Sequence, residues 1–261
     1  MGIGRIRENI AMNTPVVRIG ILAFPGMLQM DLTGPYGVFA AIPGAVVDLL
    51  WKDTLPVFSS DKLLLTPNRT LSDCPPLDIM CVPGGAGILP LLDDTVVHDF
   101  LRVQAQSTRW LCSVCTGALV LGAAGLLAGC KATTHWLSLG LLAEFGATPV
   151  QERVVVDGKR ATSAGVSAGI DMALTLVGKE WGPELASEIE LNMEYDPHPP
   201  FATGHPSRAP KELLEKLRAK TADRQAMRTA AVQRAAARLP GKALLKEPTP
   251  LGLPKADNGC F

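Results

Sequence analysis

The sequence has few aromatic side chains, no excess of charge of either sign, and no apolar run long enough to cross a bilayer. Its 25 lysine and arginine residues match 25 acidic ones, so it lacks the strong positive charge that typifies nucleic-acid-binding proteins. A membrane-spanning helix needs about 20 consecutive apolar residues, and the first 15 residues have no apolar core that would make them an export signal. We therefore expect a cytoplasmic protein that binds neither nucleic acid nor a membrane.

Two common ligand signatures are also missing. The glycine patterns that bind phosphate, G-x-G-x-x-G and G-K-[ST], do not occur in the sequence. His98, His198 and His205 show none of the spacings typical of metal ligands. The sequence therefore indicates neither a phosphate-binding loop nor a metal site.

What is present is a large apolar fraction, 47% of 261 residues, arranged as short buried runs that alternate with helical patterns. Strands are predicted at 16–24, 45–52, 78–82 and 109–114, a strand or hairpin at 57–71 with a turn near 67–68, and helices at 31–41, 94–106, 116–127 and 136–145. Strands that alternate with helices predict an α/β fold with a mostly parallel sheet and helices on both faces.

The character of the chain changes near residue 205. Residues 211–239 are rich in alanine and charged side chains, which is typical of a solvated helix. From residue 240 onward, proline, glycine and lysine suggest a disordered tail. We divide the chain into a loose N-terminal extension (1–15), an α/β domain (16–205), and a C-terminal helical and disordered tail (206–261).

One of the six cysteines lies where a thiol becomes reactive. Cys115 falls between a buried strand and an apolar helix, the arrangement called a nucleophile elbow in other α/β enzymes. The helix dipole favours the thiolate there, so we interpret Cys115 as an exposed nucleophile. The other interpretation is a buried structural cysteine, like Cys81. Cys112 completes a C-x-x-C but falls inside the strand, so a redox dithiol is the weaker hypothesis.

Two further groups follow strands that end at the same edge of the sheet as Cys115. Asp31 comes shortly after the first strand, and it could carry a proton to and from a substrate or simply cap its helix. Gly85, in the glycine cluster at 84–87, could offer a backbone N–H to developing negative charge or form an ordinary tight turn. We interpret His135 as structural rather than as a catalytic base.

Several short motifs, taken together, resemble those of one superfamily. They are Asp31-Leu-Thr-Gly-Pro35, Val82-Pro-Gly-Gly85, Ser113-Val-Cys-Thr-Gly117, Gly122-Ala-Ala-Gly-Leu-Leu127, Ala132-Thr-Thr-His-Trp136 and Ala168-Gly-Ile-Asp171. This set resembles the ThiJ/PfpI superfamily of glutamine-amidotransferase-like folds, and within it the isonitrile hydratase (isocyanide hydratase) subgroup. The resemblance covers about residues 16 to 205.

The resemblance implies a flavodoxin-like sandwich that forms a homodimer and needs no metal or organic cofactor. It implies that Cys115 is the nucleophile, Asp31 its carboxyl partner and Thr116 a supporting residue. The backbone N–H of Gly85 would contribute to the site, and the backbone at Val166 would approach the sulfur. The implied reaction converts an isonitrile and water into an N-substituted formamide through a covalent thioimidate.

Two other functions stay open at this point. Many relatives have glutamate where this chain has Asp31, and histidine where it has Thr116, so it departs from the protease-like and glyoxalase-like members. A glyoxalase-like enzyme is nevertheless one alternative. Similar motifs occur in the N-terminal halves of some AraC-type regulators, so a non-enzymatic ligand or redox sensor is the other. The region after residue 205 is too short for a DNA-binding domain of roughly 100 residues.

Overall fold

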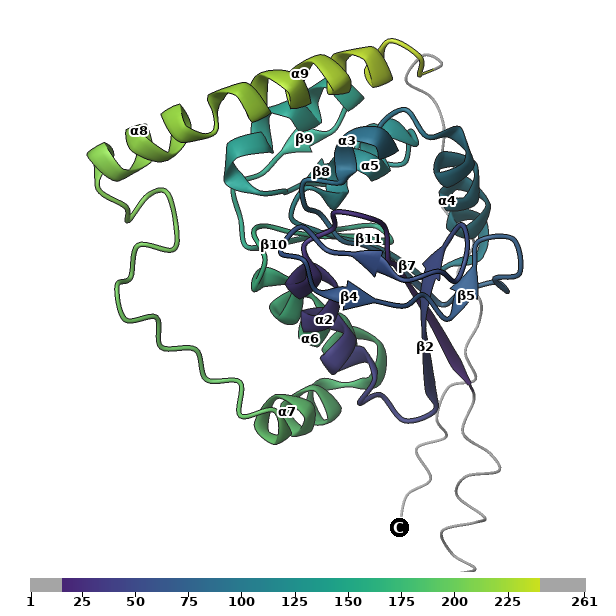
Figure 1. Ribbon diagram of the computed structural model, residues 1–261. Helices are drawn as coiled ribbons and strands as arrows, with labels where there is room; N and C mark the ends of the chain where they lie inside the picture. The colour runs from purple at the N-terminus through teal and green to yellow at the C-terminus, as the bar shows by residue number, and fades with distance from the viewer. Residues whose placement is uncertain (1–15, 240–261) are drawn as a thin grey trace, which may run out of the picture.

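A seven-stranded sheet lies at the centre of the computed structural model, which describes residues 16–239 (Figure 1). Its strands are β1 (Val17–Leu22), β2 (Ala45–Trp51), β5 (Arg69–Thr70), β6 (Ile79–Val82), β7 (Trp110–Val114), β10 (Val154–Asp157) and β11 (Arg160–Ser163). The strand order is β10-β11-β7-β6-β1-β2-β5. Every neighbouring pair is parallel except the antiparallel hairpin of β10 and β11.

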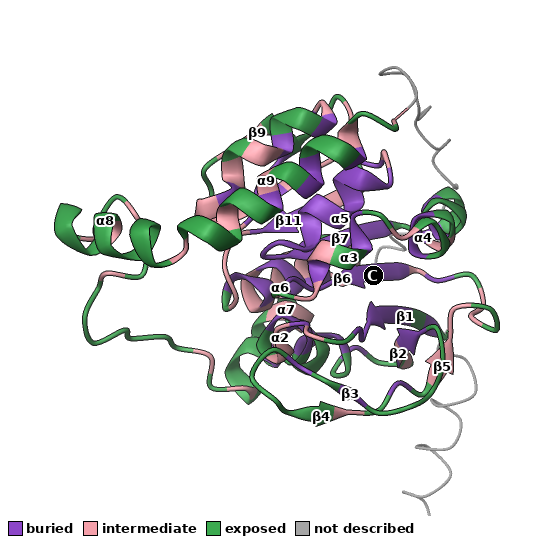
Figure 2. Cartoon of the chain, turned by 45° about the horizontal axis from the view of Figure 1, so that its top comes forward, coloured by how far each residue is buried: buried purple, intermediate pink, exposed green. Residues whose placement is uncertain are grey.

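Helices cover both faces of this sheet. They are α2 (Gln29–Phe39), α3 (Ile88–Leu91), α4 (Thr95–Ser107), α5 (Gly117–Ala123), the 3₁₀ helix η1 (Trp136–Phe145), α6 (Ala168–Trp181), α7 (Pro183–Asn192), α8 (Lys211–Lys220) and α9 (Ala222–Ala236). In Figures 1 and 2, α2, α6 and α7 lie on one side of the sheet, and α3, α5 and α9 on the other. The predicted α/β sandwich is therefore confirmed.

The central strands are buried because layers pack on both of their faces. Every residue of β6 and β7 is buried, and so are five of the six residues of β1. Figure 2 shows the buried residues concentrated in these strands and in α5. This double burial explains why the sequence shows nearly continuous apolar runs there rather than alternation.

The prediction of a turn near residues 67–68 was wrong. The hairpin in this region joins β3 (Val57–Phe58) to β4 (Leu64–Leu65), so its turn lies between residues 58 and 64. Asn68 instead anchors the edge of the main sheet, since its side-chain oxygen accepts the Leu49 N–H at 2.6 Å. A second small pair joins β8 (Lys131–Ala132) to β9 (Thr148–Pro149).

The helix expected at 211–239 consists of two helices, and the second is not simply solvated. α8 has no buried residues, whereas α9 buries Ala231, Val232 and Ala235 in the core. The Arg228 side chain is also buried, and its Nη1 donates to Ser138 Oγ of η1 at 3.0 Å. The expected extension at 1–15 and the tail from residue 240 lie outside the described residues. No helix between residues 16 and 239 is long and apolar enough to cross a membrane.

Candidate active site

Cys115 occupies the turn between β7 and α5, in a left-handed backbone conformation with φ of 53°. This conformation is uncommon for a residue with a side chain, and hydrogen bonds hold it. The Cys115 N–H donates to the carbonyl of Ala164 at 2.9 Å, and its carbonyl accepts from Thr134 Oγ1 at 2.5 Å. The predicted nucleophile elbow is therefore present.

The expectation that the Cys115 thiol is exposed was wrong, because only 6% of the residue is accessible. Burial, followed by the charge of Asp31, raises the pKa of the thiol to about 12. Hydrogen bonds from the backbone N–H groups of Thr116 and Val166 lower this pKa, but burial outweighs them. The resting side chain is therefore a protonated thiol, not the thiolate that a helix N-terminus alone would favour.

Asp31 is the carboxyl group beside this thiol. It lies in the first turn of α2, whose N-cap is Leu28, so it does not cap the helix. It is fully buried, and its Oδ2 accepts the Gly84 N–H at 3.0 Å. Burial raises the pKa of Asp31 to about 7, although hydrogen bonds with Gly84 and Cys115 lower it. Such a group can take up and release a proton near neutral pH.

The glycine loop after β6 forms hydrogen bonds with side chains of the site. Gly85 N–H donates to Thr116 Oγ1 at 3.1 Å, so it is already used and does not face the reaction as a free donor, contrary to expectation. A Cβ at Gly84 would lie 2.5 Å from the Thr116 nitrogen. The loop therefore needs glycine at 84 in order to approach Thr116 and Asp31 closely.

Val166 approaches the sulfur as the resemblance implies, since its backbone N–H is one of the hydrogen-bond donors to Cys115. Its φ of 25° is unfavourable for a β-branched residue. The loop from Ala164 to Ser167 thus supplies both an acceptor for the Cys115 N–H and a donor for its sulfur.

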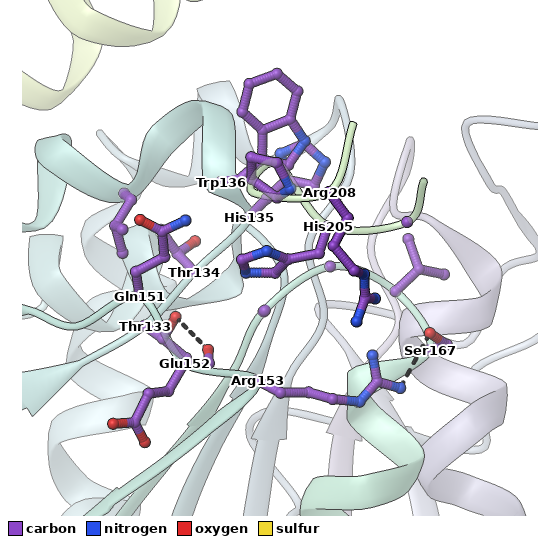
Figure 3. Close-up of a pocket in the computed structure, with 16 residues that line it drawn as sticks. Thr133, Thr134, His135, Trp136, Gln151, Glu152, Arg153, Ser167, His205 and Arg208 are labelled. Atoms are coloured by element: carbon purple, nitrogen blue, oxygen red, sulfur yellow. Dashed lines mark hydrogen bonds between the residues drawn. The ribbon is translucent and has the colours of Figure 1, made fainter. Parts of the chain in front are cut away.

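A cavity of about 500 Å³ adjoins this site (Figure 3). Its lining includes Thr134, Ala164 and Val166, three of the residues that contact Cys115. The other lining residues are Thr133, His135, Trp136, Leu139, Gln151, Glu152, Arg153, Gly165, Ser167, Gly204, His205, Pro206 and Arg208. A volume of this size suits a small organic ligand, and the thiol lies behind one wall of it.

His135 lines this cavity, although the sequence led us to interpret it as structural. Its Nδ1 accepts the Leu137 N–H at 3.4 Å, which assigns the ring proton to Nε2. Burial, with smaller contributions from Arg228 and Arg224, lowers the pKa of His135 to about 4. At neutral pH the ring is therefore uncharged, and it is a hydrogen-bond donor at Nε2 rather than a cation.

Sequence reasoning missed most of the other polar lining residues. Arg153 precedes β10, and His205 and Arg208 belong to the extended segment between α7 and α8. None of them stands in a recognisable motif, and only the fold brings them together. For Thr133 and Thr134 the sequence did give a signal, because both stand in the Thr-Thr-His-Trp motif.

The remaining cysteines of the described region are not part of the site. Cys112 lies in β7, fully buried, and its register partner in β6 is Cys81. It therefore lies along the strand rather than at the elbow, as the sequence indicated. Within residues 16–239, no group of three or more histidine, cysteine or acidic side chains is arranged to hold a metal ion.

Comparison with known proteins places this geometry in a family. Residues 17–179 match the model of the DJ-1/PfpI family. Isonitrile hydratase from Pseudomonas putida is 50% identical over 223 residues, which cover 85% of this chain and 98% of that protein. The HTH-type transcriptional regulator GbdR from Pseudomonas aeruginosa is 37% identical over 146 residues, which cover 55% of this chain but 40% of the regulator.

Solved structures agree with the sequence matches. A ThiJ/PfpI family protein from Pseudomonas syringae superposes with a TM-score of 0.81 at 37% identity, covering 85% of this chain and 91% of that one. The sequence match, the sheet order and the elbow at Cys115 all lead to the same assignment. This chain belongs to the DJ-1/PfpI family.

Proposed function

We propose that this chain is an isonitrile hydratase, which adds water to an isonitrile and releases an N-substituted formamide. The observation that carries the proposal is the 50% identity to the Pseudomonas putida isonitrile hydratase along 98% of that protein. The buried pair of Cys115 and Asp31 supplies the two groups that the reaction needs, a nucleophile and a proton carrier. Neither the match to part of a regulator nor the fold alone favours another function as strongly.

The first step forms a covalent intermediate. As the Cys115 sulfur attacks the terminal carbon of R–N≡C, the Asp31 carboxylate takes the thiol proton and then delivers it to that carbon. One S–H bond breaks, and one S–C and one C–H bond form, which gives the thioimidate Cys–S–CH=N–R. The N–H groups of Thr116 and Val166, which already lower the thiol pKa, stabilise negative charge on sulfur during the transfer.

The second step releases the product. Water adds its oxygen to the thioimidate carbon, and Asp31 passes the released proton to the nitrogen. The tetrahedral adduct collapses as the C–S bond breaks, and its hydroxyl proton returns to sulfur through Asp31. The products are H–C(=O)–NH–R and the original thiol. Division into two easier steps is the general advantage of covalent catalysis. In this scheme Thr116, held by Gly85, is a positioning residue for the elbow.

Cys115→Ala tests the assignment. With phenyl isonitrile as substrate, we expect the variant to lose formamide production by about 10³-fold or more, because no covalent intermediate can form. Cys112→Ala is the matched control, since that thiol lies buried in β7, just before Cys115, without a role in the reaction. Undiminished turnover by Cys115→Ala would refute the proposal. Absence of turnover by the wild type, together with peroxide oxidation confined to Cys115, would favour a sensor instead.

We also propose that the protein works as a cytoplasmic homodimer. The five cysteines of the described region are all free thiols, which is typical of a reducing compartment. The hairpin of β3 and β4 and its flank leave Leu55, Phe58 and Leu64 exposed, an apolar surface suited to a second copy. Light scattering of the purified protein should give twice the mass of one chain.

A further inference from the structure

One wall of the cavity beside Cys115 carries hydrogen-bond donors without acceptors. The Arg208 side chain has no hydrogen bond or ion pair to any residue in the part of the chain that the structure describes, and Figure 3 shows its guanidinium turned into the cavity. His205 Nδ1 accepts the Ser207 N–H at 3.2 Å, which leaves Nε2 as the donor of the ring. His135 presents a donor in the same way. Arg208 is exposed to solvent as well as to the cavity, so an acceptor-rich ligand would replace water at these donors.

The charges around the cavity do not cancel that of Arg208. Arg153 also lines the cavity, but its charge is offset by the ion pair with Asp171, and it donates to Ser167 Oγ at 3.2 Å. Glu152 is the carboxylate of the lining, and Figure 3 shows it on the opposite side from Arg208. Arg208 is therefore an arginine of the cavity that forms no ion pair with any acidic group of the described residues.

The lining also has apolar surface, beside further polar residues such as Thr133, Thr134 and Gln151. Trp136, Leu139 and Val166 contribute aromatic and aliphatic surface. Val166 also contacts the sulfur of Cys115 through its N–H. A ligand that fills the cavity would thus place its reactive end near Val166, its apolar body against Trp136 and Leu139, and an anionic group near Arg208.

Resting on the proposed function, we propose that the isonitriles taken by this cavity carry a carboxylate, and that Arg208 binds it. A guanidinium matches the plane of a carboxylate with two parallel N–H···O bonds. A single unpaired arginine suits one carboxylate rather than a doubly charged phosphate, which several cations would accompany. Arg208 is therefore a specificity-determining residue, and it takes no part in the chemical step.

A matched pair of substrates tests this inference. 4-Isocyanobenzoate and methyl 4-isocyanobenzoate share the reacting group and the ring, and they differ in the carboxylate. We expect the wild type to show at least a tenfold higher kcat/KM for the carboxylate. We expect Arg208→Gln to lower the ratio of the two kcat/KM values by about 10- to 100-fold, the range of a charge-assisted hydrogen bond.

Arg109→Gln is the control variant. Arg109 lies before β7, at the opposite end of that strand from Cys115, and pairs with Glu180 at 3.1 Å. Its substitution removes one positive charge from the surface and should leave the substrate ratio unchanged. Equal kcat/KM values for the two isonitriles in the wild type, or an unchanged ratio in Arg208→Gln, would overturn the inference.

A binding measurement separates this inference from the proposed function. Calorimetry with 4-formamidobenzoate and its methyl ester reports carboxylate recognition without turnover. Tighter binding of the carboxylate by the wild type, lost in Arg208→Gln, would support the site even if neither isonitrile were converted. Turnover of both isonitriles without any carboxylate preference would leave the proposed function intact and overturn the role of Arg208.

Discussion

At the scale of single residues, the chemistry depends on two buried groups whose pKa values are raised by their surroundings. The pKa of Asp31 is raised to about 7 and that of Cys115 to about 12, in both cases chiefly by burial. Because the two groups contact each other, their titration belongs to the pair. The reactive form holds a single proton, on the thiol at rest and on Asp31 during attack. When Asp31 is also protonated, the pair holds two protons, and Asp31 can no longer accept the proton of the thiol.

The pH dependence of the reaction should report this pair. We expect kcat/KM to rise with pH through about 7, as Asp31 loses its proton, and then to stay level, because the thiol retains its proton up to about 12. Initial rates with phenyl isonitrile between pH 5 and 9 would measure the profile. In Asp31→Asn the residual rate should lack this rise. A level profile from pH 5 to 9, as for an aspartate with its ordinary pKa near 4, would contradict the assigned role.

The same burial makes Asp31 costly for stability. Its pKa is raised from 3.8 to about 7 in the folded state, so the group favours folding fully below pH 4 and loses that contribution as the pH rises to about 7. At pH 8 the ionised carboxylate costs up to roughly 4 kcal/mol. Asp31→Asn should therefore keep only a residual rate yet be more stable than the wild type at pH 8, with the difference in stability shrinking toward pH 4.

Urea unfolding at pH 4, 6 and 8 would measure this difference. Asp99→Asn is the control, because the Asp99 side chain is mostly exposed and its pair with Arg102 spans one helical turn at the surface. We expect that control to change the free energy of unfolding by less than about 1 kcal/mol at any of these pH values. A loss of stability in Asp31→Asn at pH 8 would show that the carboxylate is better accommodated than its burial indicates.

At the scale of elements, the elbow depends on the contact between α5 and the end of β6. A Cβ at Gly117, the first residue of α5, would lie 2.0 Å from the carbonyl oxygen of Val82. Backbone atoms on both sides make relief by a rotamer change impossible, so the helix and the strand end would have to separate. That separation would move Cys115 away from Asp31.

Gly117→Ala should therefore destabilise the protein by more than about 3 kcal/mol and lower its activity. Gly140→Ala is the matched control, because a Cβ at Gly140 in η1 meets no atom within 4 Å. The control should be neutral or stabilising by about 0.5–1 kcal/mol, since alanine loses less backbone freedom on folding. Thermal melting of both variants tests the comparison. Similar melting temperatures for the two would contradict the close approach described here.

The elements could be predicted from the sequence where local pattern decides them, and the site only in part. The apolar runs of β6 and β7 predicted buried strands, and the rule that parallel strands end at one edge predicted that Asp31 and Cys115 meet. The burial of Cys115 depends on Thr134 and Val166, which are distant in the sequence. Local pattern carries no information about such contacts.

The polar residues that line the cavity could not be predicted from the sequence, for the same reason. His135, Arg153 and Arg208 come from three separate segments, and each is an ordinary polar residue in its own surroundings. The packing of α9 was missed because alanine-rich helices with many charges are usually solvated. Apart from Arg228, its buried residues are one valine and two alanines, which give a weak hydrophobic signal.

At the scale of the whole molecule, α9 is part of the hydrophobic core and not a separate tail. Its buried face packs on α5 and η1, and Arg228 donates to Ser138. α5 follows Cys115 directly, and η1 begins beside His135. The division of the chain at residue 205 therefore separates two parts that share one hydrophobic core.

Two truncated chains would test where the domain ends. A chain that stops at residue 205 would expose the surfaces of α5 and η1 that α9 covers, and it would leave Ser138 without Arg228. We expect it to lose several kcal/mol of stability, because buried apolar area contributes about 25 cal/mol per Å², and to lose activity with it. A chain that stops at residue 239 keeps every helix of the described region, and it is the reference for the urea unfolding of the shorter chain. If the two truncated chains unfold alike, α9 does not stabilise the core, and residues 16–205 alone hold the elbow at Cys115.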